Sequence, residues 1–320
     1  MLRWLMVSVG AAVLALDALT GQVLVHLAVP VGLAAVLLGI VAVVCRRWWI
    51  ALTAVAIVLV ALALVLPSLL VRPQSGPPLL RVMTVNLQGF EADLEALAAL
   101  VAREQVDVLA LQEVPGVPAT SLVVLRPVLP NLAVVPDPRP ATGTRIAILT
   151  RLPVLATAVE RVGEGEGAVP VTSLRVTVST GGGPAAVEEV VVRTLHLRWP
   201  LPPLGRVQGV QAAAVAAWNL PPASAELWLA DWNLTPWSPR FRAIIAGLGL
   251  DQPVLVGPTW QAFDRVPEPL SWAVGVPIDQ ILSCGGVRIG SLRIGPSLGS
   301  DHRPVLAEVV AAPGRRCRTQ

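Results

Sequence analysis

The pattern of hydrophobic positions divides the chain into an almost wholly apolar N-terminal part and a longer part of mixed polarity. From residue 5 to 71 nearly every residue is Ala, Val, Leu or Ile, in three stretches at about 4–19, 23–45 and 48–71. At about 1.5 Å per residue, the second and third stretches can cross a hydrocarbon core of about 30 Å. We therefore expect residues 1–72 to form a transmembrane region of about three helices. The first stretch is the shortest, and alone it could be the apolar core of a signal peptide.

One large domain is expected to follow this apolar part. A linker rich in Pro, Gly and Ser occupies 73–78, and residues 312–320 are left as a tail. Between them, residues 79–311 suffice for a single domain with a substantial core. Strand-like runs outnumber helices there, and several follow one another directly. This pattern favours an α+β fold, a two-sheet β-sandwich flanked by helices, over a purely parallel doubly wound sheet.

The expected elements share a simple signature, because strands are short apolar runs and helices carry apolar residues along one face. Helices are expected at 93–104, 205–219 and 238–247. Strands are expected at 79–87, 106–114, 145–150, 171–179, 187–197, 226–231, 278–282, 287–294 and 304–310. The GGGP sequence at 181–184 predicts a hairpin between the fourth and fifth of these strands.

The distribution of charge suggests an orientation in the membrane. Arg46 and Arg47 lie between the second and third apolar stretches, and no Arg or Lys lies between the first and second. Positive residues favour the cytoplasmic side. The N-terminus and this loop are thus expected inside a bacterial cytoplasmic membrane and, after three crossings, the domain outside the cytoplasm. The alternative is that the first stretch does not insert, which would place the domain in the cytoplasm.

The net charge of +3 arises in the apolar part, because basic and acidic residues are equal in number from Pro73 onward. A neutral domain argues against a nucleic-acid partner, which normally requires a basic surface. The three cysteines, Cys45, Cys284 and Cys317, are too few for a disulfide framework or a structural zinc site. Cys284 and Cys317 could pair in an oxidising compartment, which the sequence leaves open.

Polar residues that can carry chemistry recur just past the ends of the apolar strands. They are Asn86, Glu113, His196, Asp231, Asn233, Asp279, Asp301 and His302. Taken singly, each has an ordinary explanation, since Asp and Asn suit turns and a histidine can be a hydrogen-bonded core residue. Together they supply oxygen ligands for Mg²⁺ or Mn²⁺, histidines beside carboxylates, and donors for charge that develops on phosphorus. The set therefore indicates a metal-assisted phosphoryl transfer.

Six short motifs containing these residues occur in a characteristic order, which is VNLQG, LALQEV, RTLHL, LADWN, PIDQIL and GSDHRPV. In them the chain resembles the endonuclease/exonuclease/phosphatase superfamily, which includes nucleases of the DNase I kind, sphingomyelinases and inositol-phosphate phosphatases. The resemblance spans about residues 81–309 and implies a DNase I-like sandwich. It also implies that Glu113 is the main ligand of Mg²⁺ or Mn²⁺, assisted by Asn86 and Asp301. Gln88 stands where many members carry Asp or Asn, which weakens the case for a second metal.

The same resemblance implies roles for the remaining motif residues. His302, held by Asp279, would act as base toward the attacking water or stabilise the phosphoryl group. Asp231 would orient or activate the water, and Asn233 would hold a phosphate oxygen. His196 would act as acid toward the leaving oxygen.

Three functions compete for this chain. The apolar spans, and TPWSPRF after LADWN, look like the membrane-bound bacterial branch that includes VanJ-type teicoplanin-resistance proteins. That resemblance implies a phosphatase or phosphodiesterase acting on a lipid-linked phosphate or pyrophosphate at the outer membrane face. The alternative is a membrane-anchored surface nuclease, against which the neutral domain and the absence of Tyr argue. A non-catalytic binding module on the same fold is the third, and it is disfavoured because every core motif position is filled.

Overall fold

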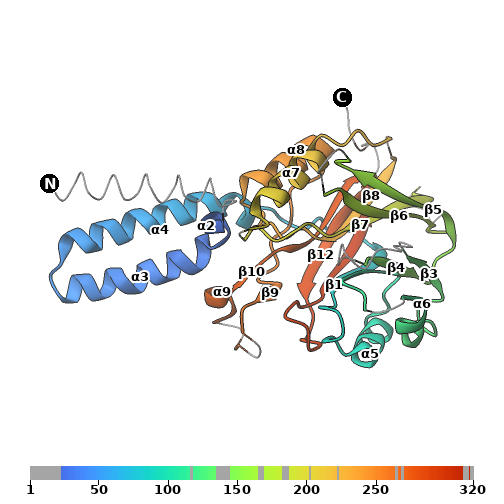
Figure 1. The fold of residues 1–320 in the computed structure, drawn as a ribbon, viewed down its shortest axis with the longest axis horizontal. Coiled ribbons are helices and arrows are strands. Elements are labelled where there is room, and N and C mark those ends of the chain that lie inside the picture. The colour runs from blue at the N-terminus through green and yellow to red at the C-terminus, as the bar shows by residue number, and fades with distance from the viewer. Residues whose placement is uncertain are drawn as a thin grey trace.

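The structure is a computed structural model, and it describes residues 23–115, 118–134, 145–164, 169–181, 187–201, 203–221, 223–263, 266–267, 270–312 and 317. A helical hairpin projects from one side of a β-sandwich (Figure 1). The first expected apolar stretch, about 4–19, lies outside the described residues.

The hairpin consists of α2 (Val23–His26), α3 (Ala28–Val44) and α4 (Trp48–Leu69). Small residues line the contact between α3 and α4: a Cβ on Gly32 would lie 3.1 Å from the Cβ of Ala61, and one on Gly39 3.3 Å from that of Ala54. Most Leu, Val and Ile side chains of both helices are exposed. Close backbone approach through small residues, with large apolar side chains facing outward, is typical of helices packed within a bilayer.

One described helix is long and apolar enough to cross a membrane. It is α4, with 22 residues and a mean hydropathy of 2.9, whereas α3 is apolar but has only 17 residues. The second apolar stretch is divided because Leu27 leaves helical geometry and Pro30 lies in the first turn of α3, where it offers no N–H to the preceding turn. The expectation of about three spans is therefore not supported, and the described residues contain one N-terminal helix that is long and apolar enough to cross a membrane.

The first sheet of the sandwich has six strands in the order β12–β13–β1–β2–β4–β3. Their bounds are β1 Pro78–Asn86, β2 Val108–Gln112, β3 Asn131–Val134, β4 Ala147–Thr150, β12 Val287–Ile294 and β13 Val305–Ala311. β1 and β2 are parallel, and the other neighbours are antiparallel. The parallel pair brings the carboxyl ends of β1 and β2 to one edge, with Asn86 opposite Gln112.

The second sheet has five strands in the order β11–β8–β7–β6–β5. Their bounds are β5 Val154–Val162, β6 Val171–Ser179, β7 Glu189–Leu195, β8 Ala225–Asp231 and β11 Asp279–Gly285. β7 and β8 are parallel, and the other neighbours are antiparallel. Two short strands, β9 (Trp260–Gln261) and β10 (Gly275–Val276), pair separately.

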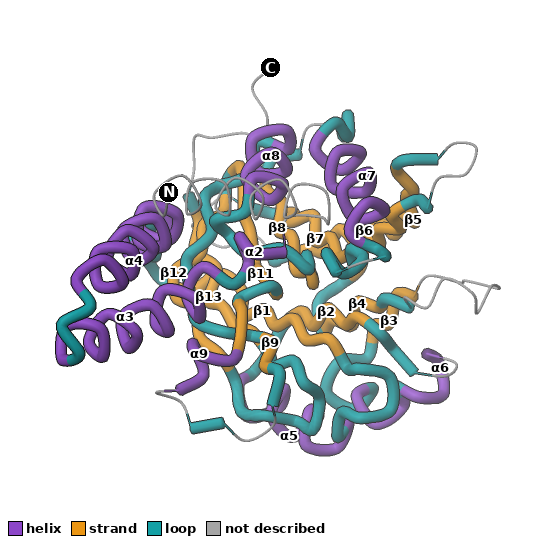
Figure 2. Tube along the Cα trace, turned by 60° about the vertical axis from the view of Figure 1, so that its left-hand side comes forward, coloured by secondary structure: helices purple, strands orange, loops and turns teal. Residues whose placement is uncertain are grey.

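Helices cover both outer faces of the sandwich (Figure 2). The helices are α5 Leu94–Glu104, α6 Pro118–Ser121, α7 Gly205–Ala216, α8 Pro239–Leu248 and α9 Ser271–Val274, with a 3₁₀ turn at Val123–Leu125. One apolar core lies between the sheets, a second between the first sheet and α5, and a third between the second sheet and α7 and α8. The predicted α+β two-sheet sandwich with flanking helices is thus confirmed.

The predicted elements mostly agree with the observed ones. Asp93 caps α5 by accepting from two backbone N–H groups, and Ser238 caps α8 with Pro239 following it. Strands β3 and β5 were not predicted; β5 is an edge strand with six of its nine residues exposed. β6 and β7 pair as the GGGP turn predicts, although residues 182–186 lie outside the described part.

Two buried features strengthen the second sheet. Cys284 in β11 forms a disulfide with Cys317, which ties residue 317 of the expected tail to the sheet. Arg193 in β7 is 1 % exposed and pairs with Glu226 and Glu160. Its guanidinium also lies 5.4 Å from the ring centre of Trp228.

Candidate active site

The strand ends of both sheets meet at one rim of the sandwich. Asn86 ends β1 and Glu113 directly follows β2, while Asp231 ends β8 in the second sheet. Asp279 begins β11 opposite Asp231, and His196 forms an isolated bridge with Asp231 just past the end of β7. The strand register thus gathers side chains that are far apart in sequence.

Asp231 is the centre of this cluster. Its Oδ2 accepts a hydrogen bond from Asn86 Nδ2 at 2.9 Å and lies 3.2 Å from His196 Nε2. The same Asn86 amide donates to Glu113 Oε1 at 3.0 Å, and His196 Nε2 lies 3.7 Å from that oxygen. Asn233 N–H donates to Asp231 Oδ1 at 2.9 Å. Residues from four of the six motifs are therefore joined by direct contacts.

Asp279 and His302 form the second half of the site. Asp279 Oδ2 lies 2.8 Å from His302 Nδ1, and both side chains are buried. The opposite ring nitrogen, Nε2, lies 3.8 Å from Asp231 Oδ2 and 3.9 Å from Asp301 Oδ1. The pair therefore directs His302 Nε2 toward the Asp231 cluster, and Asp301 joins the site through His302.

Burial and charge determine the protonation states. Burial by itself would raise the pKa of Asp231, but His196 and His302, with hydrogen bonds from His196 and Asn86, hold that pKa at about 2. Burial would likewise lower the pKa of His302, but the carboxylates of Asp279 and Asp231 raise it to about 10. Burial raises the pKa of Asp279, so this carboxyl and His302 compete for one proton. We place the proton on His302 because three carboxylates surround it, which makes Asp231 an anion and His302 a cation near neutral pH.

Backbone strain is concentrated at the same rim. Gln88, Glu113 and Asn233 adopt positive φ angles of 48°, 49° and 50°, and they are three of the five described non-glycine residues that do so. This left-handed conformation is unfavourable for residues with a side chain, so surrounding contacts must hold it in place.

Several residues that support the site carried little sequence signal. Gln88 Oε1 accepts from Asp301 N–H at 3.0 Å, and Ser300 Oγ both donates to Asn86 O and accepts from His302 N–H. Trp260 Nε1 donates to Asp301 Oδ2 at 2.8 Å, and Thr259 Oγ1 accepts from Asp279 N–H. Gln88 and Ser300 lie within motifs and could have been found there, whereas Thr259 and Trp260 lie just before and in the two-residue strand β9, which has no recognisable sequence pattern.

The donor set fits a hard divalent cation. Asp231, Asp279 and His302 form a buried group whose ligand atoms lie within 4.8 Å of one another. Asp279 Oδ1 and Asp301 Oδ1 are buried and have no hydrogen-bond partner among the described residues. Oxygen donors of this kind suit Mg²⁺ or Mn²⁺ better than a thiophilic metal. A second group, Glu226 with Cys284 and Cys317, is no such site because its sulfurs are bonded to each other.

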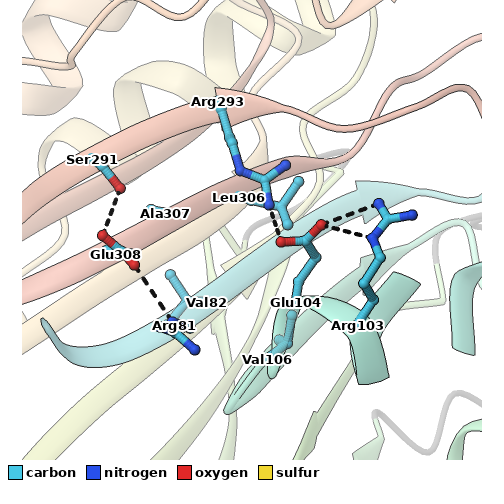
Figure 3. Close-up of a pocket in the computed structure, with 10 residues that line it drawn as sticks. All are labelled: Arg81, Val82, Arg103, Glu104, Val106, Ser291, Arg293, Leu306, Ala307 and Glu308. Atoms are coloured by element: carbon cyan, nitrogen blue, oxygen red, sulfur yellow. Dashed lines mark hydrogen bonds and ion pairs between the residues drawn. The ribbon is translucent and has the colours of Figure 1, made fainter. Parts of the chain in front are cut away.

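Two surface hollows differ in character. One borders the site and is lined by Gln88, Trp260, Phe263 and Asp301, among others. The lining of the other hollow, shown in Figure 3, includes arginines and glutamates. Arg293 and Arg103 form ion pairs with Glu104, and Arg81 forms one with Glu308. Its acidic groups are neutralised by exposed ion pairs, which contribute little to stability and leave no free carboxylate for catalysis.

Comparisons with known proteins agree with this fold. A model of the Endonuclease/Exonuclease/phosphatase family matches residues 83–302, about two thirds of the chain. An endonuclease/exonuclease/phosphatase from Beutenbergia cavernae DSM 12333 is similar in structure, with a TM-score of 0.54 and 20 % identity over 74 % of this chain and 72 % of that one. A family protein from Leptotrichia buccalis C-1013-b has a TM-score of 0.53 and 15 % identity over 72 % and 99 %. The human Nocturnin catalytic domain has a TM-score of 0.52 and 14 % identity over 75 % and 96 %. No curated protein matches the chain.

Proposed function

Because the chain belongs to the endonuclease/exonuclease/phosphatase family and is thus a phosphoesterase, we propose that it is a metal-dependent hydrolase of a lipid-linked phosphate or pyrophosphate at the outer membrane face. The observation that carries the chemistry is the buried Asp231 carboxylate, contacted by Asn86 from the first sheet and by His196 from the second. An anion and a cation, Asp231 and His302, lie 3.8 Å apart at this point.

Glu113, Asn86 and Asp301 would hold Mg²⁺ or Mn²⁺, with Asp231 close enough to share the ion. Bound there, the cation would supply positive charge to the phosphoryl oxygens. Asp279 and His302 belong to the compact buried group, but their mutual hydrogen bond occupies Nδ1 and Oδ2. A protonated His302 is no ligand, so we assign this pair to catalysis rather than to the metal.

Asp231, ionised at neutral pH, would orient or activate the attacking water. Of the two roles that the family resemblance implies for His302, the raised pKa favours donation to a phosphoryl oxygen over action as a base. Asn233 Nδ2 donates to Leu197 O at 2.9 Å and lies 3.1 Å from His196 Nε2. We therefore assign Asn233 to fixing His196, which would protonate the leaving oxygen.

The proposed orientation of the domain rests on α4 and on the two arginines that precede it. Arg46 and Arg47 lie at the tip of the hairpin, remote from the sandwich (Figure 1). If these arginines remain in the cytoplasm and α4 crosses the bilayer once, the domain that follows α4 lies outside, whatever residues 1–22 do. We propose this arrangement, with α3 packed along α4 in the apolar layer.

A substrate at the membrane surface suits this placement. The loops that carry α9, β9 and β10 lie on the side of the sandwich from which the hairpin leaves (Figure 1), and Trp260 of β9 contacts Asp301. The domain has no excess of basic residues to attract nucleic acid. The resemblance to the VanJ-like membrane-bound branch points to a polyprenyl pyrophosphate.

The test is a substrate panel for the full chain in lipid nanodiscs. Polyprenyl pyrophosphate, phospholipids with phosphate headgroups, nucleotides and DNA would each be supplied with Mg²⁺, with EDTA, and with Mg²⁺ restored. We expect phosphate release from the polyprenyl substrate, lost on chelation and recovered with metal. Asp231→Asn should abolish it, and Glu308→Gln, a surface carboxylate of the second hollow, should not. Full activity in EDTA would refute the metal mechanism, and DNA cleavage without lipid turnover would establish the nuclease instead.

The proposed topology has its own test. A reporter that is active only outside the cytoplasm, fused after Gln320, should give a signal in intact cells. A signal from a second reporter, one that is active only in the cytoplasm and is fused at the same position, would refute the orientation.

A further inference from the structure

The end of β8 and the loop that follows it contain two site residues, and this loop then contacts the N-terminal apolar segment. Asp231 and Asn233 belong to the site, and Thr235 and Trp237 come next in sequence. Thr235 N–H donates to His26 Nδ1 at 3.2 Å, and Thr235 Oγ1 lies 3.0 Å from the same nitrogen. Trp237 Nε1 donates to the carbonyl of Val25 at 2.6 Å. Residues separated by more than two hundred positions are thus joined by directed hydrogen bonds.

This joint is buried. His26 is 5 % exposed, and Thr235 and Trp237 are fully buried. Trp237 forms a small apolar core with Ala28 and Val65, at the ends of α3 and α4 nearest the sandwich. Figure 2 shows α2 beside the ends of the second sheet, so the views and the contacts agree. The hairpin is therefore packed against the loop rather than suspended from it.

A passive tether would not need such contacts. The chain between α4 and β1 already connects the helices to the domain. The joint instead fixes the path of the backbone two residues beyond Asn233, whose φ of 50° needs external support. That support comes from Gln208, which donates to the Asn233 carbonyl at 2.9 Å, and from His26, which accepts the Thr235 N–H. Without His26 this N–H would be buried with no acceptor, which is unfavourable.

We infer that His26 is a positioning residue of the active site, so that the N-terminal apolar segment is a structural part of the hydrolase rather than only its anchor. His26 holds the loop at 235–237, the loop holds Asn233 in its left-handed conformation, and Asn233 holds His196 against Asp231. The inference rests on the proposed hydrolytic function for its activity readout, and on the contacts above for its geometry.

The test uses the full chain in nanodiscs with Mg²⁺ and a small soluble phosphodiester, so that membrane access of the substrate does not matter. His26→Ala removes the acceptor, whereas His26→Asn places an amide oxygen near the position of Nδ1. Trp237→Phe removes the indole N–H together with part of the buried ring. The matched control is Val44→Ala in the same apolar segment, since Val44 is 77 % exposed near the hairpin tip.

We expect His26→Ala to lower kcat about 10- to 100-fold, because small displacements of catalytic groups have effects of this size. KM should change less than about threefold, since Asn233 and His196 are displaced but the substrate pocket remains. His26→Asn should recover most of kcat, Trp237→Phe should give a smaller loss, and Val44→Ala should match the wild type. A folded His26→Ala protein with kcat within about twofold of wild type would overturn the inference. If His26→Ala does not fold, full activity of Trp237→Phe would overturn it.

Hydrogen exchange gives a readout that needs no turnover. The Thr235 amide should exchange slowly in the wild type and in Val44→Ala, and about tenfold faster in His26→Ala. Unchanged exchange would overturn the inference even if activity fell. A wild-type protein that hydrolyses no phosphoester would refute the proposed function, while exchange at Thr235 would still decide whether His26 holds the loop.

Discussion

Removal of the Cys284–Cys317 disulfide should destabilise the catalytic domain by about 4 kcal/mol. The two cysteines are 33 residues apart, and closing a loop of this length in the unfolded chain removes conformational entropy equivalent to about 4 kcal/mol at 25 °C. Both positions are buried, so replacement by alanine in the double variant introduces no buried polar atom. With a urea dependence of about 3 kcal/mol per molar, the unfolding midpoint should fall by roughly 1 M.

The assay is urea unfolding of the full chain in detergent, followed by tryptophan fluorescence. Trp228 and Trp232 lie in the same apolar core as the disulfide and report on its surroundings. Cys45→Ala, at an exposed free cysteine, is the control and should leave the midpoint unchanged. A loss below about 1 kcal/mol in the double variant would refute the entropy argument.

Alkylation of unfolded protein from cells should modify one thiol, because disulfides persist outside the cytoplasm; three modified thiols would contradict the orientation.

The remaining predictions concern the metal, pH and a buried ion pair. Glu113→Gln should raise the Mg²⁺ concentration for half-maximal activity at least tenfold, as a metal titration would show; an unchanged value would remove Glu113 from the metal site. With metal chelated, stability should fall as pH rises from 6.5 toward 10, because the folded protein holds the His302 proton that the unfolded chain releases. In Asp279→Asn the urea midpoint should fall less steeply with pH. A wild-type midpoint that stays constant from pH 6.5 to 10 would contradict the raised pKa of His302. Arg193→Met should cost about 3–5 kcal/mol in urea unfolding, because Glu226, 1 % exposed, loses its partner; a cost below 1 kcal/mol would show that Glu226 becomes neutral or hydrated.

The candidate site could be predicted from sequence because its residues directly adjoin strand ends. A strand is recognisable from its apolar run, and the polar residue at its end is then placed on a sheet edge. Asn86, Glu113, Asp231 and Asp279 all follow this rule, and strand register brings them together. The six ordered motifs added roles that the pattern alone could not assign.

Protonation could not be predicted in the same way. Whether His302 is a base or a cation depends on how many carboxylates face it, and these come from three separate segments. The supports Thr259 and Trp260 lie just before and in β9, a two-residue strand too short to show a hydrophobic period. The disulfide was left open because two cysteines in a sequence do not reveal whether their Cα atoms approach, here to 5.0 Å.

The sequence by itself determined the division into an apolar segment and an α+β domain, because both follow from local hydrophobic periods of the chain. It also predicted which residues would form the candidate site, since those residues lie at strand ends. Only the tertiary structure decided how the two parts meet. Among the described residues it left only α4 long and apolar enough to cross a membrane, because the second apolar stretch, which composition alone reads as continuous, is divided at Leu27. It also joined His26 to Thr235, because a contact between residues so far apart depends on how the folded parts pack and not on any local pattern.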